Sequence, residues 1–124
     1  MITGLIEVIL YVEDMNAQVV FYRDKLGLPV EYPAGLAEYG SEFWVLFNAG
    51  GCKLALHGGG AKRLGVDTPK IVFGVDNIEL TRQEFTSRNV ELSEVRSPAP
   101  GISVCDGVDP EGNPFSIEQH GDVS

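Results

Sequence analysis

The spacing of apolar residues in the first half of the chain predicts a strand, a helix and three further strands. Val8, Leu10 and Val12 alternate with Glu7, Ile9 and Tyr11, and a period of two is typical of a strand. Asp14 is suited to cap a helix whose apolar positions recur at Met15, Val19, Tyr22 and Leu26, with Gly27 at its end. Short segments rich in β-forming residues then predict strands at Val30–Tyr32, Phe43–Asn48 and Lys53–His57.

The second half of the chain repeats this order. Lys70–Val75 predicts a strand, and Ile78–Arg88 predicts a helix with Leu80 and Phe85 on its apolar side. Further strands are expected at Glu91–Val95, Ser103–Cys105 and Phe115–Gln119. With an offset of 63 residues (70 minus 7), Val12 falls on Val75, Asp14 on Asn77 and Tyr22 on Phe85. The pattern indicates a structural duplication.

The duplication predicts an α+β domain of two βαβββ modules, which together form a cupped mixed sheet. We expect the first module at residues 5–60, a linker at 61–69 and the second module at 70–120. One helix covers one face of a four-stranded sheet, and each half is too small to be stable alone. Two halves, from one chain or from two, are therefore expected to enclose a pocket for a small molecule, and we expect a homodimer.

Composition narrows the classes of partner. Nine Lys and Arg against eighteen Asp and Glu leave a net charge of -9, which disfavours nucleic acid and anionic membrane surfaces. The same charge favours a cationic ligand. The chain has no apolar stretch long enough for a membrane span and no signal peptide pattern at its start, so a cytoplasmic location is expected. Cys52 and Cys105 have no CxxC partner and predict neither a zinc knuckle nor a redox dithiol.

Two motifs resemble those of a known superfamily. Phe21-Tyr22-Arg23-Asp24 runs into Leu26-Gly27, and a late turn reads Asp109-Pro110-Glu111-Gly112-Asn113. Together with the first strand they resemble the vicinal oxygen chelate superfamily, which includes glyoxalase I, extradiol dioxygenases and the fosfomycin and bleomycin resistance proteins. The resemblance implies the glyoxalase/bleomycin resistance-like fold over Leu5 to Gln119. Both motifs are interpreted as parts of the scaffold, with Phe21 and Tyr22 in the core.

The resemblance also implies positions for one divalent metal ion. The four ligand positions fall on Glu7, near Ala55, on Lys70 and on Ser116, and of these only Glu7 is a competent ligand. A site shifted along the strands would combine Glu7, His57 and Glu118, ligands acceptable to Mn, Fe, Ni or Zn. In the alternative interpretation Glu7 pairs with Lys70 in place of the ion, and His57 and His120 lie at solvated strand ends.

Two function classes remain open at this point. The first is a protein that binds a small organic molecule without metal, in a pocket lined by residues on several strands: Tyr11, Trp44, Leu46, Lys70, Val72 and Ser116. The second is a metal-dependent lyase, isomerase or dioxygenase, in which Glu7 and Glu118 also act as catalytic carboxylates. The weak set of metal ligands favours the binding protein.

Overall fold

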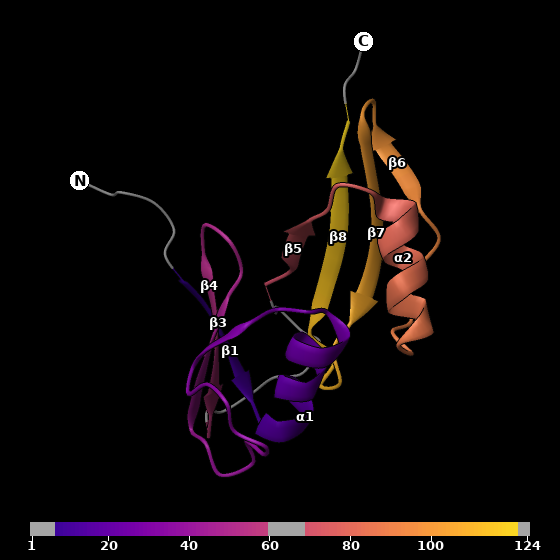
Figure 1. The fold of residues 1–124 in the computed structure, drawn as a ribbon. Coiled ribbons are helices and arrows are strands. Elements are labelled where there is room, and N and C mark those ends of the chain that lie inside the picture. Colours follow the sequence, from indigo (N-terminus) through magenta and orange to yellow (C-terminus); the bar gives the residue numbers. More distant parts are fainter. Residues whose placement is uncertain (1–6, 60–68, 122–124) are drawn as a thin grey trace, which may run out of the picture. The chain divides into compact units, whose positions relative to one another are not determined.

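The computed structural model describes residues 7–59 and 69–121, and the chain divides into two compact units, Met1–Lys62 and Arg63–Ser124. The described part of each unit contains one mixed sheet of four strands and one helical segment (Figure 1). The predicted α+β class and the two modules are therefore confirmed. The predicted linker lies almost wholly within residues 60–68, outside the described residues.

The first unit follows the predicted order of elements. Its strands and helices are β1 (Glu7–Val12), α1 (Met15–Val19), η1 (Val20–Lys25), β2 (Val30–Tyr32), β3 (Trp44–Asn48) and β4 (Lys53–Gly58). The strand order is β1-β4-β3-β2, with β1 parallel to β4 and the other pairs antiparallel. The first and last strands of the unit are therefore neighbours.

The helical segment of the first unit begins and ends where the sequence predicts. The Asp14 carboxylate accepts a hydrogen bond from the backbone N–H of Ala17 at 3.1 Å, which satisfies one unpaired donor of the first turn. Gly27 has a φ of 83°, the left-handed conformation that glycine adopts at low cost. The predicted single helix is divided, however: after Val19 the turn widens into the π-helix η1, where the Leu26 N–H bonds the Phe21 carbonyl.

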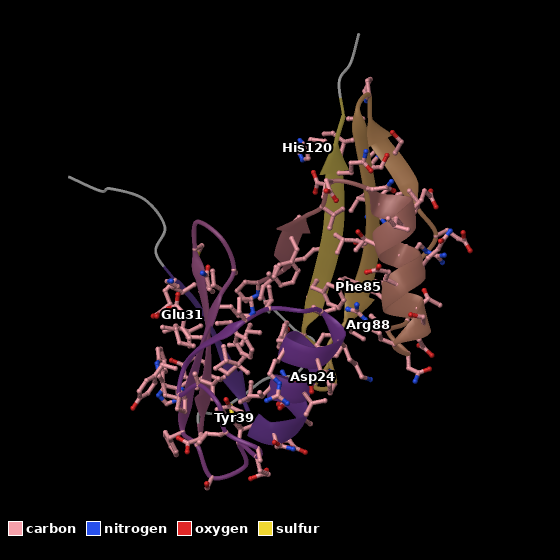
Figure 2. The ribbon with its side chains drawn as sticks, in the orientation of Figure 1. Asp24, Glu31, Tyr39, Phe85, Arg88 and His120 are labelled. Carbon is pink, nitrogen blue, oxygen red and sulfur yellow. The ribbon has the colours of Figure 1, made fainter. Side chains whose placement is uncertain are left out.

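One face of the first sheet forms the core with this helical segment. Met15, Val19 and Tyr22 are buried, as predicted, and the Tyr22 ring lies 6.1 Å from that of Phe47. Tyr39, also buried, approaches α1 from the loop before β3 (Figure 2), and its backbone N–H bonds the Asn16 side chain at 2.9 Å. The strand residues that complete this core are Leu10, Val12, Val45, Leu54 and Leu56.

The second unit repeats the topology. Its elements are β5 (Ile71–Gly74), α2 (Ile78–Ser87), β6 (Arg96–Ala99), β7 (Ile102–Val108) and β8 (Pro114–His120). The order β5-β8-β7-β6 again makes the first and last strands parallel neighbours. Asn77 caps α2 by accepting from the Leu80 N–H at 3.1 Å, at the position equivalent to Asp14.

Two details of the second half were wrong in the prediction. Glu91–Val95 is not a strand: the Ser93 carbonyl accepts from the Arg82 side chain, and the strand β6 begins only at Arg96. Pro98 is tolerated there because β6 is an edge strand, where a missing N–H need not interrupt a ladder. Leu80 is 55% exposed rather than part of the apolar side of α2, whereas Phe85 is buried.

The turn between β7 and β8 is held by one buried carboxylate. Asp109 accepts from the backbone N–H groups of Glu111 and Asn113 at 2.9 Å and from the Asn113 side-chain amide at 2.7 Å. Gly112 supplies a positive φ of 83°. Asp109 and Asn113 are both buried, so the motif serves the scaffold, as the sequence indicated.

Among the described residues, no helix is long and apolar enough to cross a membrane.

We expect Asp109→Ala to lower the free energy of unfolding by about 1–3 kcal/mol, because it leaves buried N–H donors without an acceptor. Urea denaturation measures the change. Asp24→Ala is the control: Asp24 forms an exposed ion pair with Arg23, and its loss is expected to cost less than about 1 kcal/mol. Equal effects of the two substitutions would contradict this account of the turn.

Candidate functional site

The face of the first sheet that turns away from the helical segment carries most of the site residues predicted in the first module. Aligned strand residues place their side chains on the same face. Three rows result: Glu7 with Lys53 and Asn48, Ile9 with Ala55 and Leu46, and Tyr11 with His57 and Trp44. The predicted pocket residues Tyr11, Trp44 and Leu46 thus share this face with Glu7 and His57. We call it the open face of the first sheet.

Three aromatic rings surround the His57 imidazole. The ring centroids of Tyr11, Phe43 and Trp44 lie 5.2, 5.5 and 6.0 Å from that of His57. Phe43 and Trp44 meet the imidazole edge-on, an arrangement that aromatic pairs favour. His57 Nδ1 lies 2.7 Å from the Gly58 carbonyl oxygen. His57 is therefore packed within an aromatic cluster (Tyr11, Phe43, Trp44 and His57), not at a solvated strand end as one interpretation of the sequence had it.

The aromatic cluster leaves much apolar surface uncovered within its unit. Phe43 is 65% exposed, Tyr11 46% and the neighbouring Ile9 41%. Large apolar side chains grouped in this way on an exposed surface often mark a binding site. The open face of the first sheet can therefore bind the flat apolar surface of another molecule.

The open face of the second sheet is polar instead. Val72 aligns with Ser116 and Asp106, and Gly74 aligns with Glu118 and Val104. The Asp106 carboxylate binds the Lys70 ammonium at 2.8 Å, the Arg96 guanidinium and the Ser116 hydroxyl. These four residues, Lys70, Arg96, Asp106 and Ser116, form what we call the Asp106 network.

Sequence reasoning missed Asp106 and Arg96. The predicted strand ended at Cys105, although the alternation of Val104, Asp106 and Val108 continues to the end of β7. Local alternation could have extended the strand to Asp106, but only the register of β7 with β8 places Asp106 beside Ser116. Arg96 was missed because the strand that begins at Arg96 was predicted to begin five residues earlier, at Glu91.

The Asp106 network has a clear electrostatic consequence. The hydrogen bond from Arg96, followed by those from Lys70 and Ser116, holds the pKa of the Asp106 carboxyl well below its usual range, despite partial desolvation. The hydrogen bond with Asp106 likewise raises the pKa of the Arg96 guanidinium. Asp106 is therefore an anchor for cations and a poor proton acceptor.

Glu118 and His120, two residues apart on β8, share a face and interact. His120 Nε2 lies 2.7 Å from Glu118 Oε1 near the end of β8 (Figure 2). The His120 side chain is 69% exposed. This pair is separate from the Asp106 network in hydrogen bonding, although Glu118 lies only two residues after Ser116.

The side chains at the metal positions implied by the resemblance do not fit a divalent ion. Ala55 has no donor atom and is fully buried, while Lys70 and Ser116 both bind Asp106. In the shifted set, His57 aligns with Tyr11, four residues beyond Glu7, or about 13 Å along the strand. Metal–ligand bonds are about 2 Å long, so one ion would not reach both side chains. Across residues 7–59 and 69–121, no three His, Cys, Asp or Glu side chains are grouped so as to hold a metal.

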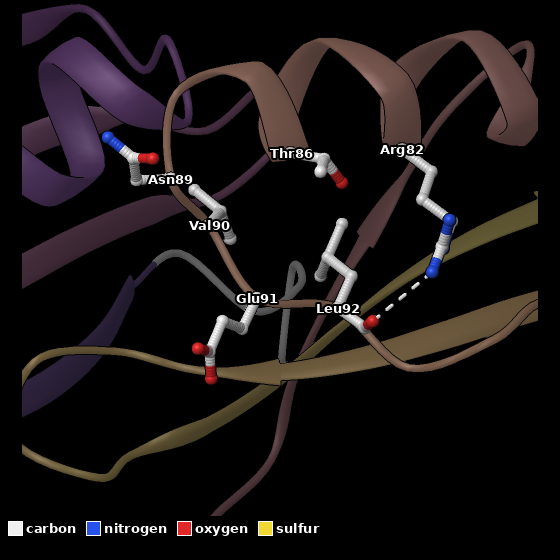
Figure 3. Close-up of a pocket in the computed structure, with 6 residues that line it drawn as sticks. All are labelled: Arg82, Thr86, Asn89, Val90, Glu91 and Leu92. Atoms are coloured by element: carbon white, nitrogen blue, oxygen red, sulfur yellow. Dashed lines mark hydrogen bonds between the residues drawn. The ribbon is translucent and has the colours of Figure 1, made fainter.

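A groove of about 550 Å³ lies beside the last turns of α2 and the segment that follows it (Figure 3). It is lined by Arg82, Thr86, Asn89, Val90, Glu91 and Leu92, and none of these was predicted as a site residue. The Arg82 guanidinium donates to the Leu92 and Ser93 carbonyls, so its donors already stabilise the backbone. These Arg82 donors are therefore already used within the protein.

We expect Asp106→Asn to lower the free energy of unfolding at pH 7 by about 1 kcal/mol, since the ion pairs are partly exposed and screened. A depressed folded-state pKa stabilises the protein above the unfolded-state pKa of about 4 and loses this effect as the pH falls through the folded-state value. The difference between variant and native protein should therefore persist from pH 7 to pH 5 and shrink only below pH 4. Urea denaturation across this range measures it, and an Asp106 carboxyl that titrates at or above pH 4 by NMR would contradict it.

Several solved structures are similar to this one over nearly the whole chain. A glyoxalase family protein from Enterococcus faecalis matches with a TM-score of 0.75 and 19% identity, over 94% of this chain and 97% of its own. A lactoylglutathione lyase from Agrobacterium tumefaciens matches with a TM-score of 0.72 and 21% identity, over 94% of this chain and 93% of its own. The antibiotic-binding protein TnmS3 from a Streptomyces species matches with a TM-score of 0.73 and 16% identity, over 96% and 97%. At these identities the likeness shows a shared fold.

Curated protein sequences yield no significant match. The family model described as the Glyoxalase/Bleomycin resistance protein/Dioxygenase superfamily, in contrast, matches residues 4–117. That match includes both motifs and every strand up to the middle of β8, and it agrees with the repeated βαβββ topology. The chain therefore belongs to the glyoxalase/bleomycin resistance protein/dioxygenase superfamily.

Proposed function

We propose that this protein binds a small organic molecule through the open face of its first sheet, without a resident metal ion. The observation that carries the proposal is the aromatic cluster, in which exposed rings of Tyr11 and Phe43 stand beside His57 and Trp44. Such rings contribute apolar area and a defined stacking geometry, so they suit a ligand with a flat aromatic or conjugated part.

Two further points support binding over metal-dependent catalysis. The residues at the implied metal positions are an alanine, a lysine and a serine, with Glu7 as the single carboxylate. TnmS3, which shares the fold, is described as an antibiotic-binding protein, so the scaffold is compatible with simple binding. The lactoylglutathione lyase shares the fold equally well, and for that reason the choice rests on this chain's own side chains. A homodimer and a cytoplasmic location stay predictions.

Trp44 is the single tryptophan of the chain, so its fluorescence reports on the aromatic cluster alone. We expect the neutral probe N-phenyl-1-naphthylamine to bind, to quench Trp44 and to brighten. Tyr11→Ala and Phe43→Ala should each weaken binding about fivefold, the effect of losing about 1 kcal/mol of ring contact.

The matched control for these variants is Leu80→Ala, which removes a comparably exposed apolar side chain from α2. Thermal melting establishes that each variant is folded. Unchanged binding in Tyr11→Ala and Phe43→Ala, or an equal loss in Leu80→Ala, would contradict binding at the aromatic cluster.

The second experiment concerns the metal. Protein purified without chelator or affinity tag is expected to contain well below one ion of Mn, Fe, Ni or Zn per chain and to show no thermal shift when these ions are added. Elemental analysis and thermal melting provide the measurements. One ion per chain, lost in Glu7→Ala or His57→Ala, would overturn the metal-free proposal and support the metal-dependent lyase, isomerase or dioxygenase with Glu7, His57 and Glu118.

A further inference from the structure

Two cations from opposite edges of the second sheet meet over its middle. Lys70 directly precedes β5 and Arg96 begins β6, and these are the two edge strands in the order β5-β8-β7-β6. Three strand spacings, about 14 Å, separate the edges. Both side chains nevertheless reach Asp106 on β7: the Lys70 ammonium binds Oδ1 at 2.8 Å and the Arg96 guanidinium binds Oδ2.

We propose that Lys70 and Arg96 bind an oxyanion, the carboxylate or phosphate group of a small molecule, while Asp106 holds the two cations in position. This inference goes beyond the proposed function, because it concerns the open face of the second sheet and none of its residues belongs to the aromatic cluster.

The charges of the Asp106 network leave one positive charge in excess. Lys70 and Arg96 carry two positive charges, and Asp106 neutralises one of them. The other carboxylate on the described strands of this face is Glu118, which contacts the His120 imidazole at 2.7 Å. Within the Asp106 network itself, an incoming oxyanion would balance the second positive charge.

Both cations keep donors free for a ligand. A guanidinium has five N–H donors and an ammonium has three, and Arg96 Nη1 and Lys70 Nζ each donate to a single oxygen of Asp106. In the part of the chain that the structure describes, Arg96 Nε and Nη2 contact no acceptor. The side chains of Lys70 and Arg96 are 43% and 50% exposed, so these donors are accessible within the unit.

Hydrogen bonds from two serines hold Asp106 in place. Ser116 is only 1% exposed, and its hydroxyl donates to Asp106 Oδ1, which orients the carboxylate from below. The Asp106 backbone N–H also bonds the Ser93 hydroxyl at 2.9 Å. Cations held by a fixed carboxylate lose less conformational entropy when a ligand binds. Exposed ion pairs add little to stability, so stability alone is a weak reason for this arrangement.

The test is NMR of the full chain, following the Arg96 Nε–H signal and the Lys70, Asp106 and Ser116 amides. Sodium acetate and inorganic phosphate are titrated separately at constant ionic strength maintained with sodium chloride. We expect saturable shifts with at least one probe, and the probe that saturates at the lower concentration identifies the preferred group. Lys70→Gln and Arg96→Gln should each weaken binding about tenfold, and Arg96→Lys should weaken it less than Arg96→Gln.

The chain provides matched controls on its first unit. Lys53 pairs with Glu31 and Arg23 pairs with Asp24, both at partly exposed positions. Lys53→Gln and Arg23→Gln remove the same charges and should leave binding unchanged. Shifts that do not saturate with either probe, or equal weakening by the control variants, would overturn the proposal. Because Trp44 fluorescence is measured on the other sheet, failure here is distinguishable from failure of the proposed function.

Discussion

One helix covers only one face of a four-stranded sheet, and both candidate sites of this chain, the aromatic cluster and the Asp106 network, depend on that constraint. In both units the apolar side chains of alternate strand positions pack beneath the helical segment, as Leu54 and Leu56 do in β4. The side chains at the intervening positions do not pack under the helix of their unit, so they can be aromatic, polar or charged. Because the first and last strands pair in parallel, residues far apart in sequence, such as Tyr11 and His57, become direct neighbours on the open face.

The two open faces carry different side chains on the same scaffold. The first carries an aromatic cluster around His57, and the second carries two cations joined through Asp106. Lys70 and Ser116 stand where the resemblance implied metal ligands, and both are bonded to a carboxylate that the chain itself supplies. These bonds to Asp106 support the proposal of metal-free binding, and the two cations of the network support the proposal of an oxyanion ligand.

The net charge of the chain does not describe the charge at each candidate site. The excess of acid, -9 over the chain, favours a cationic ligand for the protein as a whole. Electrostatic effects between exposed groups fade over about 10 Å in salt, so a local pair such as Lys70 and Arg96 can attract an anion on an acidic protein. Net charge sums over all residues of the chain. The charge at one site depends on which residues the fold brings together there.

The sequence by itself determined the class of fold, the duplication and the roles of the two motifs, because local alternation and capping residues such as Asp14 and Asn77 act over a few positions. It also grouped Tyr11, Trp44 and Leu46 as candidate pocket residues, and the strand register places them on one face with His57. Tertiary structure decided the rest. The exposure of Leu80 depends on how α2 packs on its sheet. The start of β6, the packing of His57 among rings and the convergence of Lys70 and Arg96 on Asp106 depend on strand pairing between distant segments, for which local patterns hold no information.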